Sequence, residues 1–245
     1  MAKTQRGFDY EHNVAKTLKR YNLVQHNFRP AGNRSDQPDL MLNYRNEKQP
    51  CELKLKAASA GSIVLRWKDG SWGFDEDSDD PEKIFIQSLV KDIDLLIILN
   101  KKWTATPYKR DRDHLWEATA GKISPSDRYK RDKDNFPELV GTIPPSAVES
   151  YYNRKNTYYI NIGTHGFFQL GNRDPYNLKT LPTFRNSAVT QWRARVQSKE
   201  PTRYQFTFEL AFWMNKKSVY NIGPVLGNGP KIDTSRLNLS VFKDL

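Results

Sequence analysis

Cysteine is nearly absent from this chain of 245 residues, in which Cys51 stands alone. A single cysteine excludes an internal disulfide framework and any zinc site built from several cysteines. The 4 histidines are too scattered along the sequence to suggest a histidine-based zinc site or nuclease motif. A disulfide-stapled or zinc-finger scaffold is therefore excluded, and a reducing compartment suits the protein.

Long apolar runs are absent as well. Nowhere do eighteen apolar residues follow one another, so the sequence offers no candidate for a membrane-spanning helix. The first residues, "MAKTQRGFDYEHN", lack the apolar core of a signal peptide. We expect a soluble, intracellular protein that resides in the cytoplasm and has no membrane partner.

Acidic residues are fewer than basic ones, 28 against 39, which gives a net charge of +11. Aromatic residues make up 12% of the chain and hydrophobic residues 37%, more than a disordered basic protein would contain. A folded protein with this excess of positive charge attracts polyanions, and nucleic acid is the commonest of them. The simpler alternative is a basic surface that serves solubility alone.

Residues 8–21 have apolar side chains at helical spacing, with Glu11 on the same stripe, which predicts an amphipathic helix. Three strands are expected next, at residues 23–29, 40–44 and 51–56. A helix that begins near Pro81 and the apolar run "DLLIILN" then predict a second helix and a buried strand. The expected order is therefore helix, three strands, helix, strand.

Two further segments complete the expected organisation. Residues 62–74 predict a hairpin inserted into the core, because alternating apolar residues flank the turn pair Asp69-Gly70. Residues 101–145 are polar and basic, and several later segments, such as "TYYINIG" and "RYQFTFELAFWMN", have strand composition. We expect an α/β protein with a mixed central sheet: a core at residues 1–100, and a basic insertion with a β-rich extension at residues 101–245, packed on the same domain.

The candidate chemistry lies on the second and third expected strands. Strand alternation places Glu52, Lys54 and Lys56 on one face and the apolar residues between them on the other. Asp39 and Glu52 on neighbouring strands can offer two carboxylates to a hard cation such as Mg²⁺, which prefers oxygen ligands. Lys54 beside them can stabilise charge on a phosphate, or orient or deprotonate an attacking water. Glu11 can supply a third acid.

These residues resemble the PD-(D/E)XK nuclease superfamily, which includes restriction endonucleases, Holliday junction resolvases and phage nucleases. The match is Pro38-Asp39, twelve intervening residues, and then Glu52-Leu53-Lys54. The resemblance implies an αβββαβ restriction-endonuclease-like core over residues 7–100. It also implies that Asp39, Glu52 and Leu53 bind Mg²⁺, or Mn²⁺ as a substitute, and that Lys54 is the active-site lysine. Glu11 then corresponds to the helix acid found in many members.

Other interpretations of the same residues stay open. Glu52, Lys54 and Lys56 can form the solvated face of a strand, with Glu11 exposed at the edge of its helix. Lys56 also competes with Lys54 for the role of active-site lysine. Because Lys56 lies one pleat further along the strand, a contact with a substrate phosphate suits it better.

A second cluster predicts contacts with nucleic acid. The stretch "FRNSAVTQWRARVQSKEPTR" combines basic residues with an aromatic side chain, as backbone neutralisation and base stacking require. The candidates are Arg185, Trp192, Arg193, Arg195 and Arg203, together with Lys56. A solvated basic helix is the alternative.

The sequence therefore predicts a magnesium-dependent endonuclease that hydrolyses phosphodiester bonds in DNA. Two alternatives remain: a nuclease selective for branched DNA, such as a junction resolvase, and a non-catalytic nucleic-acid-binding module on the same fold. A homodimer is compatible with cutting both strands of a duplex, since two symmetric sites would suffice.

Overall fold

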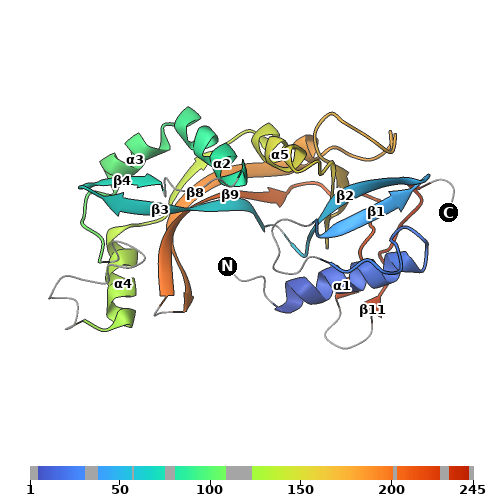
Figure 1. Ribbon diagram of the computed structural model, residues 1–245, viewed down its shortest axis with the longest axis horizontal. Helices are drawn as coiled ribbons and strands as arrows, with labels where there is room; N and C mark the ends of the chain where they lie inside the picture. Colours follow the sequence, from blue (N-terminus) through green and yellow to red (C-terminus); the bar gives the residue numbers. More distant parts are fainter. Residues whose placement is uncertain are drawn as a thin grey trace. The chain divides into compact units, whose positions relative to one another are not determined.

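The computed structural model describes residues 5–30, 38–56, 58–74, 81–108, 123–200, 203–226 and 232–242. It confirms an α/β protein with mixed β-sheet and a β-rich C-terminal part (Figure 1). Within these residues, no helix is both long and apolar enough to cross a membrane.

The chain forms two compact units. Unit 1 is built from Ser59–Ile143 and Gln191–Ala211, and unit 2 from Ala2–Ala58, Pro144–Thr190 and Phe212–Leu245. The division therefore does not follow a single boundary near residue 100, because each unit collects segments from separate parts of the sequence.

Unit 2 contains a sheet of four strands in the order β1-β2-β6-β7. The β1 and β2 strands are antiparallel, β2 and β6 are parallel, and β6 and β7 are antiparallel. The main elements of this unit are α1 (Gln5–Lys19), β1 (Leu40–Tyr44), β2 (Glu47–Lys54), α5 (Pro145–Arg154), β6 (Tyr159–Ile162), β7 (Gly166–Gln169), η2 (Phe184–Asn186), β10 (Val225–Leu226) and β11 (Ile232–Asp233).

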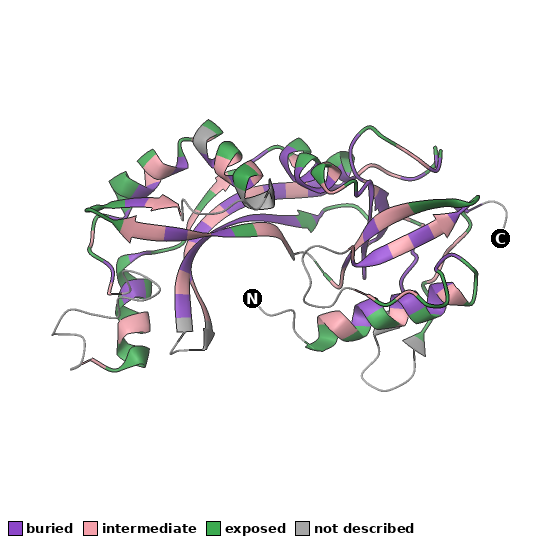
Figure 2. Cartoon of the chain, in the orientation of Figure 1, coloured by how far each residue is buried: buried purple, intermediate pink, exposed green. Residues whose placement is uncertain are grey.

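The helix α1 forms where the helical periodicity predicts it. Its residues Tyr10, Val14 and Leu18 are buried in one hydrophobic cluster with Leu40 of β1 and Leu53 of β2. This stripe covers the apolar face of the β1 and β2 strands (Figures 1 and 2). The other face of β2 carries polar side chains, among them Glu52 and Lys54.

Unit 1 contains a sheet of five strands in the order β4-β3-β9-β8-β5. Its elements are β3 (Ala58–Lys68), β4 (Ser71–Phe74), α2 (Pro81–Asp92), α3 (Leu95–Lys102), α4 (Pro125–Asn135), β5 (Leu139–Thr142), and the parts of β8 (Ala188–Glu200) and β9 (Arg203–Met214) that belong to it. The predicted hairpin is confirmed as β3 and β4. Asp69 and Gly70 both have positive φ, 52° and 80°, as a type I′ turn requires.

Aromatic rings fill the covered side of this sheet. Trp72 of β4 contacts Trp103, Phe136 and Phe206, with ring centroids 4.6 to 5.5 Å apart. The Asn100 side chain accepts a hydrogen bond from the Trp72 backbone N–H (2.7 Å) and so ties α3 to β4. These large aromatic side chains form the apolar packing between the sheet and α3.

Two predicted strands are wrong. The run "DLLIILN" forms α3, in which Leu95 and Leu99 are buried while Ile97 between them is 66% exposed. Burial every four residues identifies a helix that uses one face, which a short apolar run cannot distinguish from a buried strand. Residues 23–29 form turns and irregular structure, although Leu23 and Val24 are buried.

The strand that pairs with the second edge of β2, and the helix before that strand, also differ from the expected core at residues 7–100. They are α5 and β6, and not the segments within residues 81–100. Parallel pairing of β2 with β6 requires a crossover connection, and here that connection holds Ser59–Ile143 of unit 1 as well as α5. Local sequence patterns could not predict this pairing, because β2 and β6 lie far apart in the sequence.

Candidate active site

Asp39 lies directly before β1, at the point where β2 continues past its partner. The first residue of β1, Leu40, pairs with Cys51, and the Asp39 carboxylate then accepts a hydrogen bond from the Leu53 backbone N–H (3.1 Å). This register is set by the two-residue turn Arg45-Asn46, in which both residues have positive φ. Just before the start of β1, the Asp39 side chain therefore takes the place of a backbone carbonyl as the hydrogen-bond acceptor for β2.

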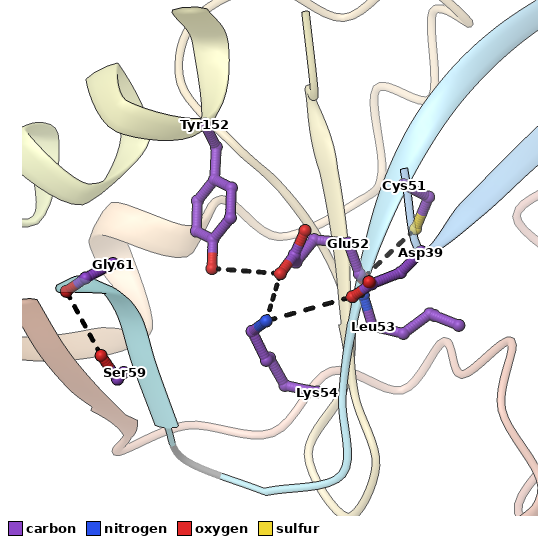
Figure 3. Close-up of polar contacts among 8 residues, drawn as sticks. All are labelled: Asp39, Cys51, Glu52, Leu53, Lys54, Ser59, Gly61 and Tyr152. Carbon is purple, nitrogen blue, oxygen red and sulfur yellow. Dashed lines mark hydrogen bonds and ion pairs between the residues drawn. The ribbon is translucent and has the colours of Figure 1, made fainter. Parts of the chain in front are cut away.

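Glu52 and Lys54 share one face of β2, as strand alternation predicts, while Cys51 and Leu53 on the other face are buried. The Lys54 ammonium contacts Glu52 Oε1 and lies 4.0 Å from Asp39 Oδ2 (Figure 3). The exposed fractions of the Lys54, Glu52 and Asp39 side chains are 16%, 15% and 8%. The structure thus brings Asp39, Glu52 and Lys54 together at the end of one strand.

Tyr152 of α5 is a further member of this group that the sequence analysis missed. It is 1% exposed, and its hydroxyl donates a hydrogen bond to Glu52 Oε1 (3.5 Å) (Figure 3). The Pro at the start of α5 and its apolar spacing signal a helix in the sequence. Which strand that helix faces is decided only by tertiary pairing.

The environment shifts the pKa values of Glu52 and Lys54. Burial raises the pKa of the Glu52 carboxyl above its usual value, and the charge of Asp39 adds to the rise, while Lys54 opposes it. Burial lowers the pKa of Lys54, but the charges of Glu52 and Asp39 outweigh this effect and raise it overall. The lysine therefore remains a cation between the two carboxyl groups.

Gly163 holds the end of β2 by a close backbone approach. Its N–H donates a hydrogen bond to the Lys54 carbonyl (2.8 Å), and a Cβ at this position would lie 2.3 Å from the Leu55 carbonyl oxygen. Successive carbonyls of a strand point to opposite edges. Because the Lys54 carbonyl faces the β6 edge, the Leu53 carbonyl faces the edge where Asp39 lies.

Two carboxylates and a backbone carbonyl are the oxygen ligands that Mg²⁺ and Mn²⁺ accept, so the residues fit such an ion. Among the described residues, no group of three or more His, Cys, Asp or Glu is arranged to hold a metal. A cation at this site would therefore depend on Asp39, Glu52, the Leu53 carbonyl and water.

Glu11 and Lys56 are the other residues that the sequence predicts near this group. Glu11 is buried in α1, on the helix that packs against the opposite face of β2. Lys56 lies beyond the end of β2 and is exposed.

The residues predicted to contact nucleic acid are divided between the two units. In unit 2, Arg185 binds Glu149 of α5 through Nε (3.0 Å) and Nη2 (2.6 Å). In unit 1, Arg193 and Arg195 both bind Glu209. Trp192 is 6% exposed on the covered side of the sheet, where its indole occupies the space beside Gly141, so base stacking would require it to leave the core. The side chain of Arg203 lies outside the described residues.

No family model matches the chain, and no curated protein matches it. The chain is similar to the solved structure of HhaI endonuclease in complex with DNA, with a TM-score of 0.46 and 9% sequence identity. The likeness covers 85% of this chain and 92% of that one.

Proposed function

We propose that this protein is a magnesium-dependent nuclease that hydrolyses phosphodiester bonds in DNA. The observation that carries the proposal is the position of the Lys54 ammonium against Glu52 and near Asp39, at the end of β2. Two acids and one lysine leave a net negative charge. Such a group suits a divalent cation and, next to it, the charge of a scissile phosphate.

The chain's own residues take distinct roles. Asp39 and Glu52, with the Leu53 carbonyl, hold the ion, for which Mn²⁺ substitutes. The bound ion supplies Lewis-acid polarisation of the phosphate and lowers the pKa of its water. Lys54 acts as a fixed cation that stabilises negative charge on the phosphate. The net charge of +11 supports DNA as the partner, because it favours association with a polyanion.

The test compares Asp39→Asn and Glu52→Gln with the parent protein in Mg²⁺ buffer. Asn at position 39 retains an oxygen that can accept the Leu53 N–H, so the loss of charge is separated from the loss of the hydrogen bond. Glu47→Gln is the matched control, because Glu47 is an exposed residue of the same strand. We expect both site variants to lose cleavage and the control to retain it.

The substrates are linear, supercoiled, single-stranded and four-way DNA. Preference for the four-way form would indicate a junction resolvase, with the same residues at work. Near-parental cleavage by either site variant, or cleavage that persists in EDTA, would contradict the proposal.

A further inference from the structure

The two faces of the unit 1 sheet differ in chemistry. Ring contacts place Trp72 and Phe206 on one face, and Trp192 with Phe208 on the same face of the neighbouring strands. Alternation then directs Arg193, Arg195 and Glu209 to the opposite face. Contacts between Glu209 and both arginines confirm that these three side chains share it.

The strand β3 adds to this second face. Trp67 of β3 contacts Trp72, which assigns Trp67 to the aromatic face. Its neighbours Arg66 and Lys68 therefore lie on the face of the arginines. At the far edge, Val140 of β5 pairs with Arg193 and is 52% exposed, so this face is open to solvent there. We call Arg66, Lys68, Arg193, Arg195 and Glu209 the arginine face.

Glu209 lies at the centre of this face and contacts two of its arginines. Its side chain is 3% exposed, while Arg193 and Arg195 are 25% and 23% exposed. Arg193 Nε and Arg195 Nη2 (2.8 Å) both contact the same carboxylate oxygen. A guanidinium group has five N–H donors, so each arginine retains donors beyond those that face Glu209.

We propose that the arginine face binds duplex DNA through its backbone phosphates; the identity of the polyanion rests on the proposed function. Charge complementarity supports this partner, because the cations of the face exceed Glu209 and the nearby Glu138, which lies 3.8 Å from Arg193. Planar guanidinium groups match the geometry of phosphate oxygens. The shared contact with Glu209 fixes both groups before DNA arrives, which reduces the entropy cost of binding.

A duplex suits this face better than a single strand. Proteins that bind single strands stack bases on exposed aromatic rings. Within the described part of unit 1, the rings of Trp67, Trp72, Trp192, Phe206 and Phe208 belong to the aromatic face. The arginine face instead carries polar side chains such as Gln197, whose amide oxygen accepts a hydrogen bond from the buried Thr207 hydroxyl (3.4 Å).

The test is salt-titrated binding of a fluorescent duplex to the full chain in EDTA, so that cleavage does not interfere. Arg193→Gln, Arg195→Gln and Lys68→Gln each remove one cation, and Lys68 is an exposed residue at the end of β3. Each variant should reduce the slope of log affinity against log salt by about 0.9. Arg20→Gln, at an exposed site in unit 2, is the matched control and should leave the slope unchanged.

The outcomes separate this proposal from the nuclease assignment. Unchanged slopes in all three variants, with intact melting curves, would overturn the arginine face even if Asp39→Asn abolishes cleavage. Reduced slopes together with unaffected cleavage in the Asp39 and Glu52 variants would retain the face and reject the active site. Equal losses for the single-stranded form of the same oligonucleotide would overturn the preference for a duplex.

Discussion

Each unit brings acidic and basic side chains of neighbouring strands together, but in opposite proportions. In unit 2 the two carboxyl groups of Asp39 and Glu52 share one lysine, Lys54. In unit 1 the guanidinium groups of Arg193 and Arg195 both contact Glu209, and Arg193 also lies 3.8 Å from Glu138. The first group has an excess of negative charge, and the arginine face, which also includes Arg66 and Lys68, has an excess of positive charge.

The sign of the excess charge indicates which kind of partner would reduce the electrostatic repulsion within each group. Repulsion between two carboxylates falls when a cation joins them, and repulsion between two guanidinium groups falls when an anion joins them. In both cases a shared counter-charge, Lys54 or Glu209, holds the like charges in place until the partner binds. A metal ion suits unit 2 and a phosphate backbone suits unit 1, and five variants test this contrast.

The largest effect is expected for Lys54→Ala, which removes the cation from the acidic group. Without it, charge on the phosphate is no longer stabilised, and the cleavage rate should fall about 10² to 10³-fold. Duplex affinity should change little, because Lys54 is mostly buried and acts at one phosphate only. Single-turnover rates and equilibrium binding measure the two quantities. A loss confined to affinity would place Lys54 among general DNA contacts.

Gly163→Ala should be next in size. The new Cβ would clash with the Leu55 carbonyl and separate β6 from β2, at a cost of about 1 to 3 kcal/mol in the free energy of unfolding. Gly73→Ala in β4 of unit 1 is the matched control, since a Cβ there meets no atom within 4 Å. Denaturant melts compare the two variants. Equal stability of both would show that the end of β2 tolerates displacement.

Glu209→Gln tests the counter-charge in unit 1. The two arginines lose their common anion and repel each other, so the variant should be less stable by about 1 to 2 kcal/mol. Thermal melts at low and high salt measure the loss, which should shrink as salt screens the arginines. A more stable variant would mean that burying Glu209 costs more than its ion pairs contribute.

Glu52→Gln should have the opposite sign, and its effect should depend on pH. The raised pKa of Glu52 means that the folded protein retains this proton more strongly than the unfolded chain. Stability therefore falls as pH rises from the ordinary glutamate pKa through the raised one. The neutral amide removes this loss, so the variant should match the parent in acid and exceed it at higher pH. Melts in metal-free buffer across this range would contradict the prediction if the parent stays the more stable.

Tyr152→Phe should have the smallest effect. It removes the hydroxyl that donates to Glu52 at 3.5 Å, a long hydrogen bond, so activity at limiting Mg²⁺ should fall by about 10-fold. Saturating Mg²⁺ should restore most of the rate, because the hydroxyl orients a proposed ligand and does not touch the phosphate. Tyr21→Phe, at an exposed tyrosine, is the control. A loss that Mg²⁺ does not restore would argue against this orienting role.

Local patterns in the sequence were enough to predict the elements that depend only on neighbouring residues. The apolar stripe of α1, the turn at Asp69-Gly70 and the common face of Glu52 and Lys54 follow from helical and strand periodicity and from turn chemistry. The convergence of Asp39 with Glu52 was also predictable, because a two-residue turn leaves the two strands only one close pairing.

Only the tertiary structure decided the features that depend on partners distant in sequence. The run "DLLIILN" became a helix because Leu95 and Leu99 pack inward on one face. Tyr152 reaches Glu52 because β6, far along the chain, pairs with β2. Arg193 and Arg195 share Glu209 because β8 lies beside β9. Side-chain periodicity reports which face of a strand or helix a residue occupies, but which element lies against that face depends on long-range packing.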